Sequence, residues 1–206
     1  MIDPANITRF NCSHAELEEL ILFWICVAGK TAKVVSRQLE GILQELRHFH
    51  PKKTPFQLIK NIQLYELTGI LKRHGIGCYN TKAKGICQIV NSGINLHTCS
   101  IKDLECFHGI GPKTARCFII HSRKDAQCAG LDTHVLKFLG VLGYDVPKST
   151  PTGKLYESLE QAFLKQAKRA MMPIYELDLS VWRYYSGNST PEDVKLVSKL
   201  KKNVSI

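Results

Sequence analysis

The residues with the clearest chemical potential form a glycine hairpin, Gly109-Ile110-Gly111, between two short predicted helices. Pro112 suits the first position of the second helix, where a missing N–H leaves no hydrogen bond unmade. Backbone N–H groups at the start of that helix point outward, so the turn predicts a site for an anion such as phosphate. Glycine lets the phosphate approach closely and allows a positive φ in the turn. We expect Ile110 to anchor the hairpin inward, and such a hairpin binds a DNA backbone without reading its sequence.

The charge of the chain also indicates an anionic partner. Its 206 residues include 28 Lys and Arg against 18 Asp and Glu, which gives a net charge of +10 and a pI near 9.2. Nucleic acid is the usual partner of such a protein, because each phosphate neutralised by a basic side chain releases counterions. A basic protein with no nucleic-acid role fits the charge equally well. The inference therefore depends on the hairpin and its flanks.

Two apparent phosphate-binding loops are excluded by their spacing. Gly29-Lys30-Thr31 matches the end of a P-loop, but the first glycine that this motif requires falls on Trp24. In residues 111–114, a proline separates the glycine from the lysine. We therefore exclude a nucleoside triphosphatase.

The cysteines indicate packing roles in a reducing compartment. Eight are present, no C-x-x-C pair occurs, and most lie in apolar runs. Cys99 and Cys106 have the separation of one step of an iron–sulfur motif, but no closely spaced partners follow, so we expect no metal site. Residues 1–11 lack the apolar core of a signal peptide, and the apolar run at residues 20–28 is shorter than the roughly 20 residues that span a bilayer. We expect an intracellular protein with no membrane partner, cytoplasmic in a prokaryote or nuclear in a eukaryote.

Apolar residues recur at helical spacing along almost the whole chain, and no stretch alternates as a strand does. We therefore predict an all-α fold, ordered almost end to end, with no repeat at solenoid period. Predicted helices start at Ser13, which forms a capping box with Glu16, and at or near residues 35, 54, 64, 80, 100, 112, 132 and 150, with a last apolar helix over residues 177–182. The segment after Pro191 holds four lysines, and we expect it to be a solvated basic end.

Two segments, HGIGPKTAR (residues 108–116) and GLDTHVLKF (residues 130–138), together resemble the helix-hairpin-helix DNA glycosylase superfamily, in particular its endonuclease III branch. A third, IGCYNTKAKGI (residues 76–86), is similar to the segment of that branch that reaches the minor groove beside a lesion. Similar helix order covers roughly residues 13–187. The resemblance implies two helical lobes around a cleft. We assign the first lobe, with six helices and the hairpin, to residues 10–126, and the second to residues 1–9 and 127–206.

The resemblance also implies a catalytic pair. The family's nucleophile, a lysine two residues after the second hairpin glycine, falls on Lys113, and its aspartate falls on Asp132, 19 residues later. The unprotonated Lys113 amine would attack the anomeric carbon of a flipped-out nucleotide, and the resulting imine permits β-elimination of the 3′ phosphate without a metal. Asp132 would stabilise positive charge on the sugar or accept a proton from the amine. Taken singly, Lys113 is an ordinary first-turn residue and Asp132 an ordinary N-cap. Because both residues occur together, within segments that match the family, we favour the catalytic interpretation.

Further residues are implied to contact DNA. They belong to the hairpin, the segment beside the lesion, the loop after the first predicted helix and the helix after the aspartate: Gly109, Ile110, Gly111, Thr114, Gly29, Lys30, Cys78, Tyr79, Asn80, Lys82 and His134. His134 fits a structural hydrogen bond equally well. The implied partner is double-stranded DNA with a base lesion or an abasic site, bound by a monomer. No cofactor is implied, although the hairpin is compatible with a monovalent ion.

The sequence departs from the endonuclease III branch at three points. Most members end in four clustered cysteines that hold an iron–sulfur cluster, whereas no cysteine follows Cys128 here, so we expect no cluster. The glutamine that fills the gap left by the flipped nucleotide falls on Gly29, and the wedge leucine falls on Cys78. Lys30 and Tyr79 are the candidates to replace them.

These departures leave the substrate open. A short, cluster-free chain with the Lys–Asp pair also resembles small 8-oxoguanine glycosylases, so 8-oxoguanine and an oxidised pyrimidine are equally compatible. A mismatched, undamaged base is less compatible, because those members usually lack the lysine. A non-catalytic hairpin protein that binds DNA is an alternative, and it predicts that Lys113 and Asp132 are replaceable without loss. A helical scaffold with incidental charge is another, and it predicts no duplex affinity at moderate salt.

Overall fold

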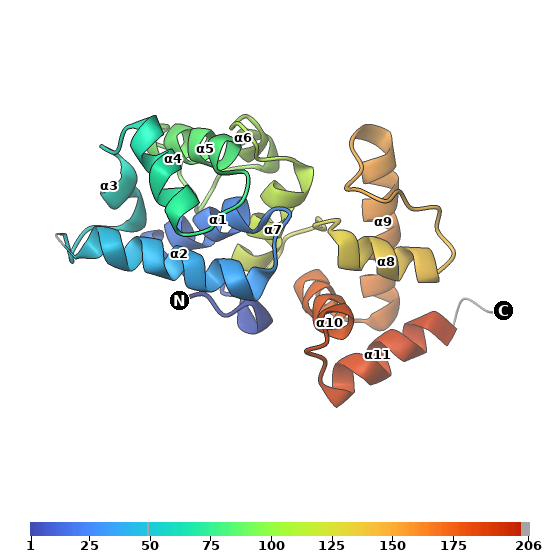
Figure 1. Cartoon of the computed structure of the whole chain (residues 1–206). Coiled ribbons are helices and arrows are strands. Elements are labelled where there is room, and N and C mark those ends of the chain that lie inside the picture. Colours follow the sequence, from blue (N-terminus) through green and yellow to red (C-terminus); the bar gives the residue numbers. More distant parts are fainter. Residues whose placement is uncertain (49, 203–206) are drawn as a thin grey trace. The chain divides into compact units, whose positions relative to one another are not determined.

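The computed structural model describes residues 1–48 and 50–202 (Figure 1). Within these residues all regular structure is helical, with one short 3₁₀-helix and 11 α-helices, and helices account for 64% of them. The all-α prediction is therefore confirmed. The chain divides into two compact units, Met1–Phe118 and Ile119–Ile206. In the described part of the chain, no helix has both the length and the apolar character needed to cross a membrane.

The first unit is built around one buried helix. It contains η1 (Pro4–Asn6), α1 (His14–Val27), α2 (Ala32–Arg47), α3 (Pro55–Ile59), α4 (Leu64–Arg73), α5 (Tyr79–Asn91) and α6 (Ile101–Glu105), and α7 (Pro112–Ser122) begins in it. Helix α1 packs against α2, α3 and α5. Nine of its 14 residues are buried, including the neighbours Ile21 and Leu22, which point to different faces. Burial on more than one face explains why this helix is apolar almost all round.

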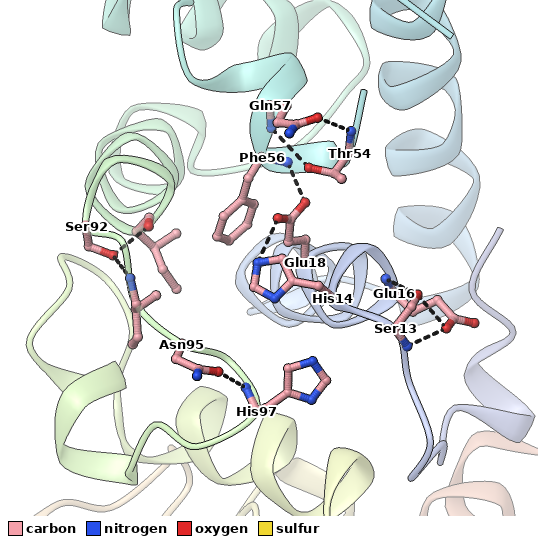
Figure 2. Close-up of polar contacts among 12 residues, drawn as sticks. Ser13, His14, Glu16, Glu18, Thr54, Phe56, Gln57, Ser92, Asn95 and His97 are labelled. Atoms are coloured by element: carbon pink, nitrogen blue, oxygen red, sulfur yellow. Dashed lines mark hydrogen bonds and ion pairs between the residues drawn. The ribbon is translucent and has the colours of Figure 1, made fainter. Parts of the chain in front are cut away.

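Side-chain caps start α1 and α3 where the sequence predicted them (Figure 2). Ser13 and Glu16 exchange hydrogen bonds, and the Ser13 N–H donates to Glu16 Oε2 at 2.8 Å. Thr54 forms the same reciprocal pair with the glutamine three residues later. Between the two helices, the Phe56 N–H donates to Glu18 Oε2 at 2.9 Å. Glu18 is buried, so this bond fixes α3 against α1 in the interior.

Residues 1–9 pack in the first unit, whereas the resemblance implied that they join the second lobe. Ile2 and Ile7 are buried, and the Ser36 hydroxyl donates a hydrogen bond to the Ile2 carbonyl. The terminal ammonium lies 2.9 Å from a carboxylate oxygen of Glu40 in α2. Two buried apolar side chains, together with a hydrogen bond and an ion pair to α2, therefore hold this segment in the first unit. The division between the units also differs, since it falls after Phe118 and not after residue 126.

The second unit has its own apolar core. It contains the end of α7, then α8 (Thr133–Val141), α9 (Gly153–Ala170), α10 (Ile174–Ser186) and α11 (Pro191–Lys202). Each of the four complete helices contributes to this core, through Phe138, Phe163, Val181 and Leu200 among others. The Phe138 and Phe163 rings meet edge to face with their centroids 6.1 Å apart, a favoured aromatic geometry.

The basic C-terminal segment is a packed helix, so the expectation of a solvated end is wrong for residues up to 202. Val197 and Leu200 of α11 are buried. Asp193 is buried at the start of the helix, where its two carboxylate oxygens accept hydrogen bonds from the Arg183 guanidinium of α10, both at 2.9 Å. In the sequence, lysines occur on both sides of Val197 and Leu200, so the apolar side of this helix was not recognised.

Four helices begin at other residues than predicted. Helices α2 and α10 begin at Ala32 and Ile174, three residues before the predicted 35 and 177. Helix α5 begins at Tyr79 and not at Asn80, because Cys78 takes a left-handed conformation with φ +53°. The Cys78 carbonyl then accepts the first helical hydrogen bond, from the Lys82 N–H at 3.0 Å. Helix α9 begins at Gly153, three residues later than predicted. A left-handed residue other than glycine is uncommon, and Cys78 lies in the segment that the resemblance places beside a lesion.

Candidate active site and nucleic-acid interface

The predicted hairpin lies between α6 and α7. Its three central residues differ in backbone conformation and in burial. Gly109 has φ +75°, a left-handed conformation that favours glycine. Ile110 is 3% exposed, so it anchors the turn as the sequence indicated. Gly111 is not left-handed, and a Cβ added to it would meet no atom of the described chain within 4 Å, its two chain neighbours aside. The fold of the turn therefore does not require glycine at position 111.

Helix α5 supports the hairpin through two close approaches and a hydrogen bond. A Cβ on Gly85 would lie 2.2 Å from the His108 carbonyl oxygen, so only glycine fits there. The His108 N–H donates to Gln88 Oε1 at 2.7 Å, and a Cβ on Gly109 would lie 3.0 Å from Thr81 Cγ2. Sequence reasoning missed Gly85 and Gln88. A glycine inside a helix was the available signal, since it costs about 1 kcal/mol relative to alanine.

Helix α7 is tied to α6 beside the hairpin. Arg116 Nη1 lies 2.8 Å from Glu105 Oε1, so an ion pair joins the two helices of the motif. Thr114 is 4% exposed, which places its side chain inside the protein and not on a DNA-facing surface. Its backbone N–H belongs to the first turn of α7, where N–H groups have no partner within the helix. A DNA contact by Thr114 stays a prediction for this N–H group.

The predicted nucleophile lies against an aromatic ring. Lys113 is half-buried in the first turn of α7, and its Nζ lies 5.3 Å from the centre of the Trp24 ring. Trp24 comes from the last turn of α1. The electron-rich face of an indole attracts an ammonium group, so the contact restrains a side chain that otherwise has many rotamers. The sequence indicated Trp24 only as an apolar residue of a buried helix, and its place beside Lys113 was missed.

Lys30, Lys82 and Lys113 form a group of three lysines in the first unit, from the loop after α1, from α5 and from α7. Lys82 is 5% exposed, and its Nζ donates a hydrogen bond to the Cys26 carbonyl at 2.6 Å. Burial lowers the pKa of Lys82, and the positive charges of Lys30 and Lys113 lower it further. The Lys82 ammonium therefore lies inside the protein, and this corrects the expectation that it contacts DNA directly.

The loop after α1 meets the turn before α5. A Cβ on Gly77 would lie 2.0 Å from Lys30 Cε, so this glycine makes room for the Lys30 side chain. Gly29, with φ +72°, and Cys78 are both exposed next to this contact. The structure therefore brings Gly29, Lys30 and Cys78 together, and their contact with DNA stays a prediction.

Tyr79 and Asn80 form the first turn of α5. Tyr79 is half-buried, and Lys72 Nζ lies 5.7 Å from the centre of its ring. Asn80 is exposed. Their contact with DNA stays a prediction.

Asp132 is the N-cap of α8 in the second unit, as the sequence predicted. Its Oδ1 accepts hydrogen bonds from the His134 N–H at 2.9 Å and the Val135 N–H at 2.8 Å. These bonds fix the carboxylate at the positive end of a helix, which stabilises negative charge. His134 contributes its backbone to this cap, and its side chain is half-buried.

Helix α9 fixes the segment that leads into Asp132. The Tyr156 hydroxyl donates to the Ala129 carbonyl at 2.8 Å and accepts from the Leu131 N–H at 3.1 Å. Glu160 Oε1 accepts from the Ala129 N–H at 2.9 Å. Both α9 side chains are buried, so their hydrogen bonds lie in the interior, where they hold the segment strongly. Sequence reasoning missed both, because a partner 25 or 31 residues away leaves no local pattern.

The site residues are divided between the two units. Lys113 and the rest of the lysine group belong to the first unit, with the hairpin up to Gly111, and Asp132 and His134 belong to the second. The pairing of Lys113 with Asp132 stays a prediction. Among the side chains that the structure describes, no group of three or more His, Cys, Asp or Glu residues is placed to hold a metal ion.

Two solved structures share this fold. The 8-oxoguanine glycosylase/lyase of Methanocaldococcus jannaschii, in complex with a 15mer DNA containing 8-oxoguanine, has a TM-score of 0.68 and 23% sequence identity over 87% of this chain and 85% of that chain. A second structure of the 8-oxoguanine DNA glycosylase from the same organism has a TM-score of 0.66 and 23% identity, over 86% and 81% of the chains. No family model and no curated protein sequence matches this chain. At this identity the likeness shows the fold, which is the helical fold of that glycosylase.

Proposed function

We propose that this protein is a DNA glycosylase with AP-lyase activity, which removes an oxidised base through an imine on Lys113. The observation that carries the proposal is the position of Lys113, in the first turn of α7, two residues after the glycine hairpin and against the Trp24 ring. The likeness of fold to a glycosylase/lyase solved with lesion-containing DNA supports it. The net charge of +10 suits a polyanionic substrate.

The hairpin binds a phosphate of the damaged strand. Backbone N–H groups at the start of α7 donate to the phosphate oxygens, and the helix dipole favours the negative charge. Gly111 leaves the space for this approach, since nothing of the described chain lies within 4 Å of where a Cβ would be. Because this phosphate binds at Gly111, two residues before Lys113, it holds the damaged strand close to the nucleophile.

The exposed surface of Gly29, Lys30 and Cys78 meets the duplex where the nucleotide leaves the base stack. A glycosylase needs such a contact because the bond that it breaks is inaccessible inside the duplex. Lys30 supplies a positive charge and a long side chain, and Gly77 accommodates it. These residues differ from the glutamine and leucine of the endonuclease III branch. We therefore infer that other side chains fill the space that the flipped nucleotide leaves in the duplex.

The covalent steps begin with unprotonated Lys113. Its Nζ forms a bond to C1′ of the flipped nucleotide while the bond from C1′ to the base breaks, and the base leaves with that electron pair and takes up a proton. Loss of protons from nitrogen and opening of the sugar give a C1′=N imine. The imine withdraws electrons from C2′, so a C2′ proton is lost and its electron pair forms a C=C bond as the 3′ C–O bond breaks. Water then hydrolyses the imine and regenerates the lysine.

Asp132 assists the first step. Its carboxylate is held by the His134 and Val135 N–H groups, so it keeps one orientation during the reaction. We infer that it stabilises positive charge on the sugar as the base leaves, or accepts a proton from the attacking amine. Both roles need an ionised carboxylate at a fixed position.

We propose 8-oxoguanine as the first substrate to test. The neighbour with the same fold was solved with DNA that contains this base. An oxidised pyrimidine is the second candidate, because the segment at residues 76–86 resembles the endonuclease III branch.

Borohydride trapping tests the proposal. The protein is mixed with duplexes that each contain one lesion, and sodium borohydride reduces any imine to a stable protein–DNA adduct. We expect an adduct with 8-oxoguanine or an oxidised pyrimidine, and none with undamaged duplex. Lys113→Gln should abolish the adduct, whereas Lys165→Gln, which removes an exposed lysine of α9, should retain it.

The outcome separates the alternatives. Duplex binding without base release or an adduct would identify a non-catalytic hairpin protein. Base release without an adduct would identify a glycosylase that uses water, and would remove Lys113 from the role of nucleophile. An adduct that persists in Lys113→Gln would place the imine on another amine.

A further inference from the structure

Lys82 is a buried cation beside the proposed nucleophile, and the steps above do not use it. It is 5% exposed on α5. Its Nζ donates a hydrogen bond to the Cys26 carbonyl at 2.6 Å. Lysine is almost never fully buried unless it is paired, because removing its charge from water is costly. The cost indicates that Lys82 has a role in this part of the protein.

The hydrogen bond of Lys82 fixes the end of α1. The last four carbonyl groups of a helix have no partner within it, and Cys26 contributes one of them. A positive charge at this end also complements the helix dipole. Trp24 lies in the same last turn, with its ring 5.3 Å from Lys113 Nζ. Lys82 therefore holds the turn against which the nucleophile lies.

Lys82 lies near several other titratable groups. The titratable groups that face Lys82 are Cys26 of α1, Cys78 at the start of α5, Lys30 from the loop after α1, and Lys113 of α7. Burial lowers the pKa of Lys82 and the two lysines lower it further, while the two cysteines act in the opposite direction. Burial raises the pKa of Cys26 to about 12, so this thiol carries no negative charge at neutral pH that would offset the lysines.

We propose that Lys82 is a positioning residue for Lys113, which holds the last turn of α1, and with it the Trp24 ring, beside the Lys113 amine. This inference rests on the proposed function, in which Lys113 is the nucleophile. A ring that is held in one place restrains the amine in one orientation, and orientation of the attacking group accelerates its reaction. Lys82 itself forms no covalent bond with the substrate, because its Nζ is buried and bonded to Cys26.

The test separates the rate of imine formation from duplex binding. The maximal rate of borohydride trapping, and the duplex concentration that gives half of it, are measured for the wild type, Lys82→Met and Lys82→Arg on a duplex with one abasic site. We expect Lys82→Met to lower the maximal rate about tenfold and to leave the half-saturating concentration unchanged. Lys82→Arg keeps a donor for the Cys26 carbonyl and should retain most of the rate. Lys84→Met removes an exposed lysine from the same helix and is the matched control.

The results that overturn the inference differ from those that overturn the proposed function. A folded Lys82→Met protein with the wild-type maximal rate refutes it, and so does an equal fall in Lys84→Met. If Lys82→Met and Lys82→Gln both fail to fold while Lys82→Arg folds, Lys82 serves stability alone, and the inference is also refuted. If the wild type forms no adduct, the failure lies with the proposed function.

Discussion

Lys113 and Trp24 meet with the lysine Nζ 5.3 Å from the centre of the indole ring. Lys113 lies in the first turn of α7 and Trp24 in the last turn of α1, far apart in the sequence. Without this contact the lysine side chain would sample many rotamers, and selecting one of them costs up to about 2 kcal/mol. The aromatic contact reduces this cost before a substrate binds, which is how orientation accelerates a reaction.

Replacement of Trp24 should therefore slow imine formation more than it weakens DNA binding. We expect Trp24→Leu to lower the single-turnover trapping rate about tenfold, because a contact of about 1 kcal/mol is lost together with the orientation that it gives. Trp24→Phe should keep part of the rate, and Trp182→Phe is the control for loss of a tryptophan elsewhere. Equal rates in Trp24→Leu and the wild type would show that the ring does not position the amine.

The two hairpin glycines should respond differently to alanine. Gly111→Ala should unfold at the wild-type temperature, because its Cβ meets nothing in the described chain, yet bind duplex about tenfold more weakly if phosphate approaches this backbone. Gly109→Ala should lose about 1 kcal/mol of stability, because φ is +75° and Thr81 lies 3.0 Å from the new Cβ. Thermal melting and fluorescence anisotropy at two salt concentrations measure both effects. Unchanged affinity in Gly111→Ala would argue against a phosphate at the hairpin.

Asp132 combines a structural and a proposed chemical role, and two substitutions separate them. Asn caps helices as well as Asp does, so Asp132→Asn should keep the wild-type stability and lose activity at least a hundredfold. Asp132→Ala should lose the activity and also about 1 kcal/mol of stability, because the His134 and Val135 N–H groups lose their acceptor. Urea titration and single-turnover base release are the measurements. Normal turnover in Asp132→Asn would exclude the carboxylate from the mechanism.

Local chemistry predicted most of the helices, because their starts are encoded within four residues. Ser13, Thr54, Ser100 and Asp132 each accept a hydrogen bond from the backbone of the helix that they begin. Where the start depends on a turn conformation, the prediction failed. Cys78 precedes α5 with φ +53°, and nothing in the type of this residue indicates a left-handed backbone.

The candidate site was predictable only in part. The glycine pattern and the resemblance identified the hairpin and Lys113, but the resemblance placed Lys82 on the surface that binds DNA. Its partner is the Cys26 carbonyl, 56 residues earlier, and a backbone acceptor leaves no mark in the sequence. The same reason explains why Gln88, which accepts from the His108 N–H, was missed. Contacts between distant segments decide burial, and burial decides which polar residues are available to a ligand.

The last prediction concerns the acid stability of the second unit. Burial alone would raise the pKa of Asp193, but hydrogen bonds from Arg183, from Thr190 and from Ser180 outweigh it and lower the pKa to about 2. The unfolded chain has the ordinary value of 3.8. Because the folded pKa is the lower one, the ionised carboxylate stabilises the fold above pH 4, and this contribution is lost as the pH falls towards 2. It amounts to about 2 kcal/mol.

Wild-type protein should therefore lose stability between pH 4 and pH 2, and Asp193→Asn should lose about 2 kcal/mol less over the same range. Trp182 lies in α10, so its fluorescence in a Trp24→Phe background follows urea unfolding of this unit. Asp125→Asn, which removes an exposed carboxylate of the same unit, is the control and should follow the wild type. A parallel loss in Asp193→Asn and the wild type would mean that other carboxylates account for the acid sensitivity. The bidentate pair with Arg183 would then hold α11 in place without making its stability depend on pH.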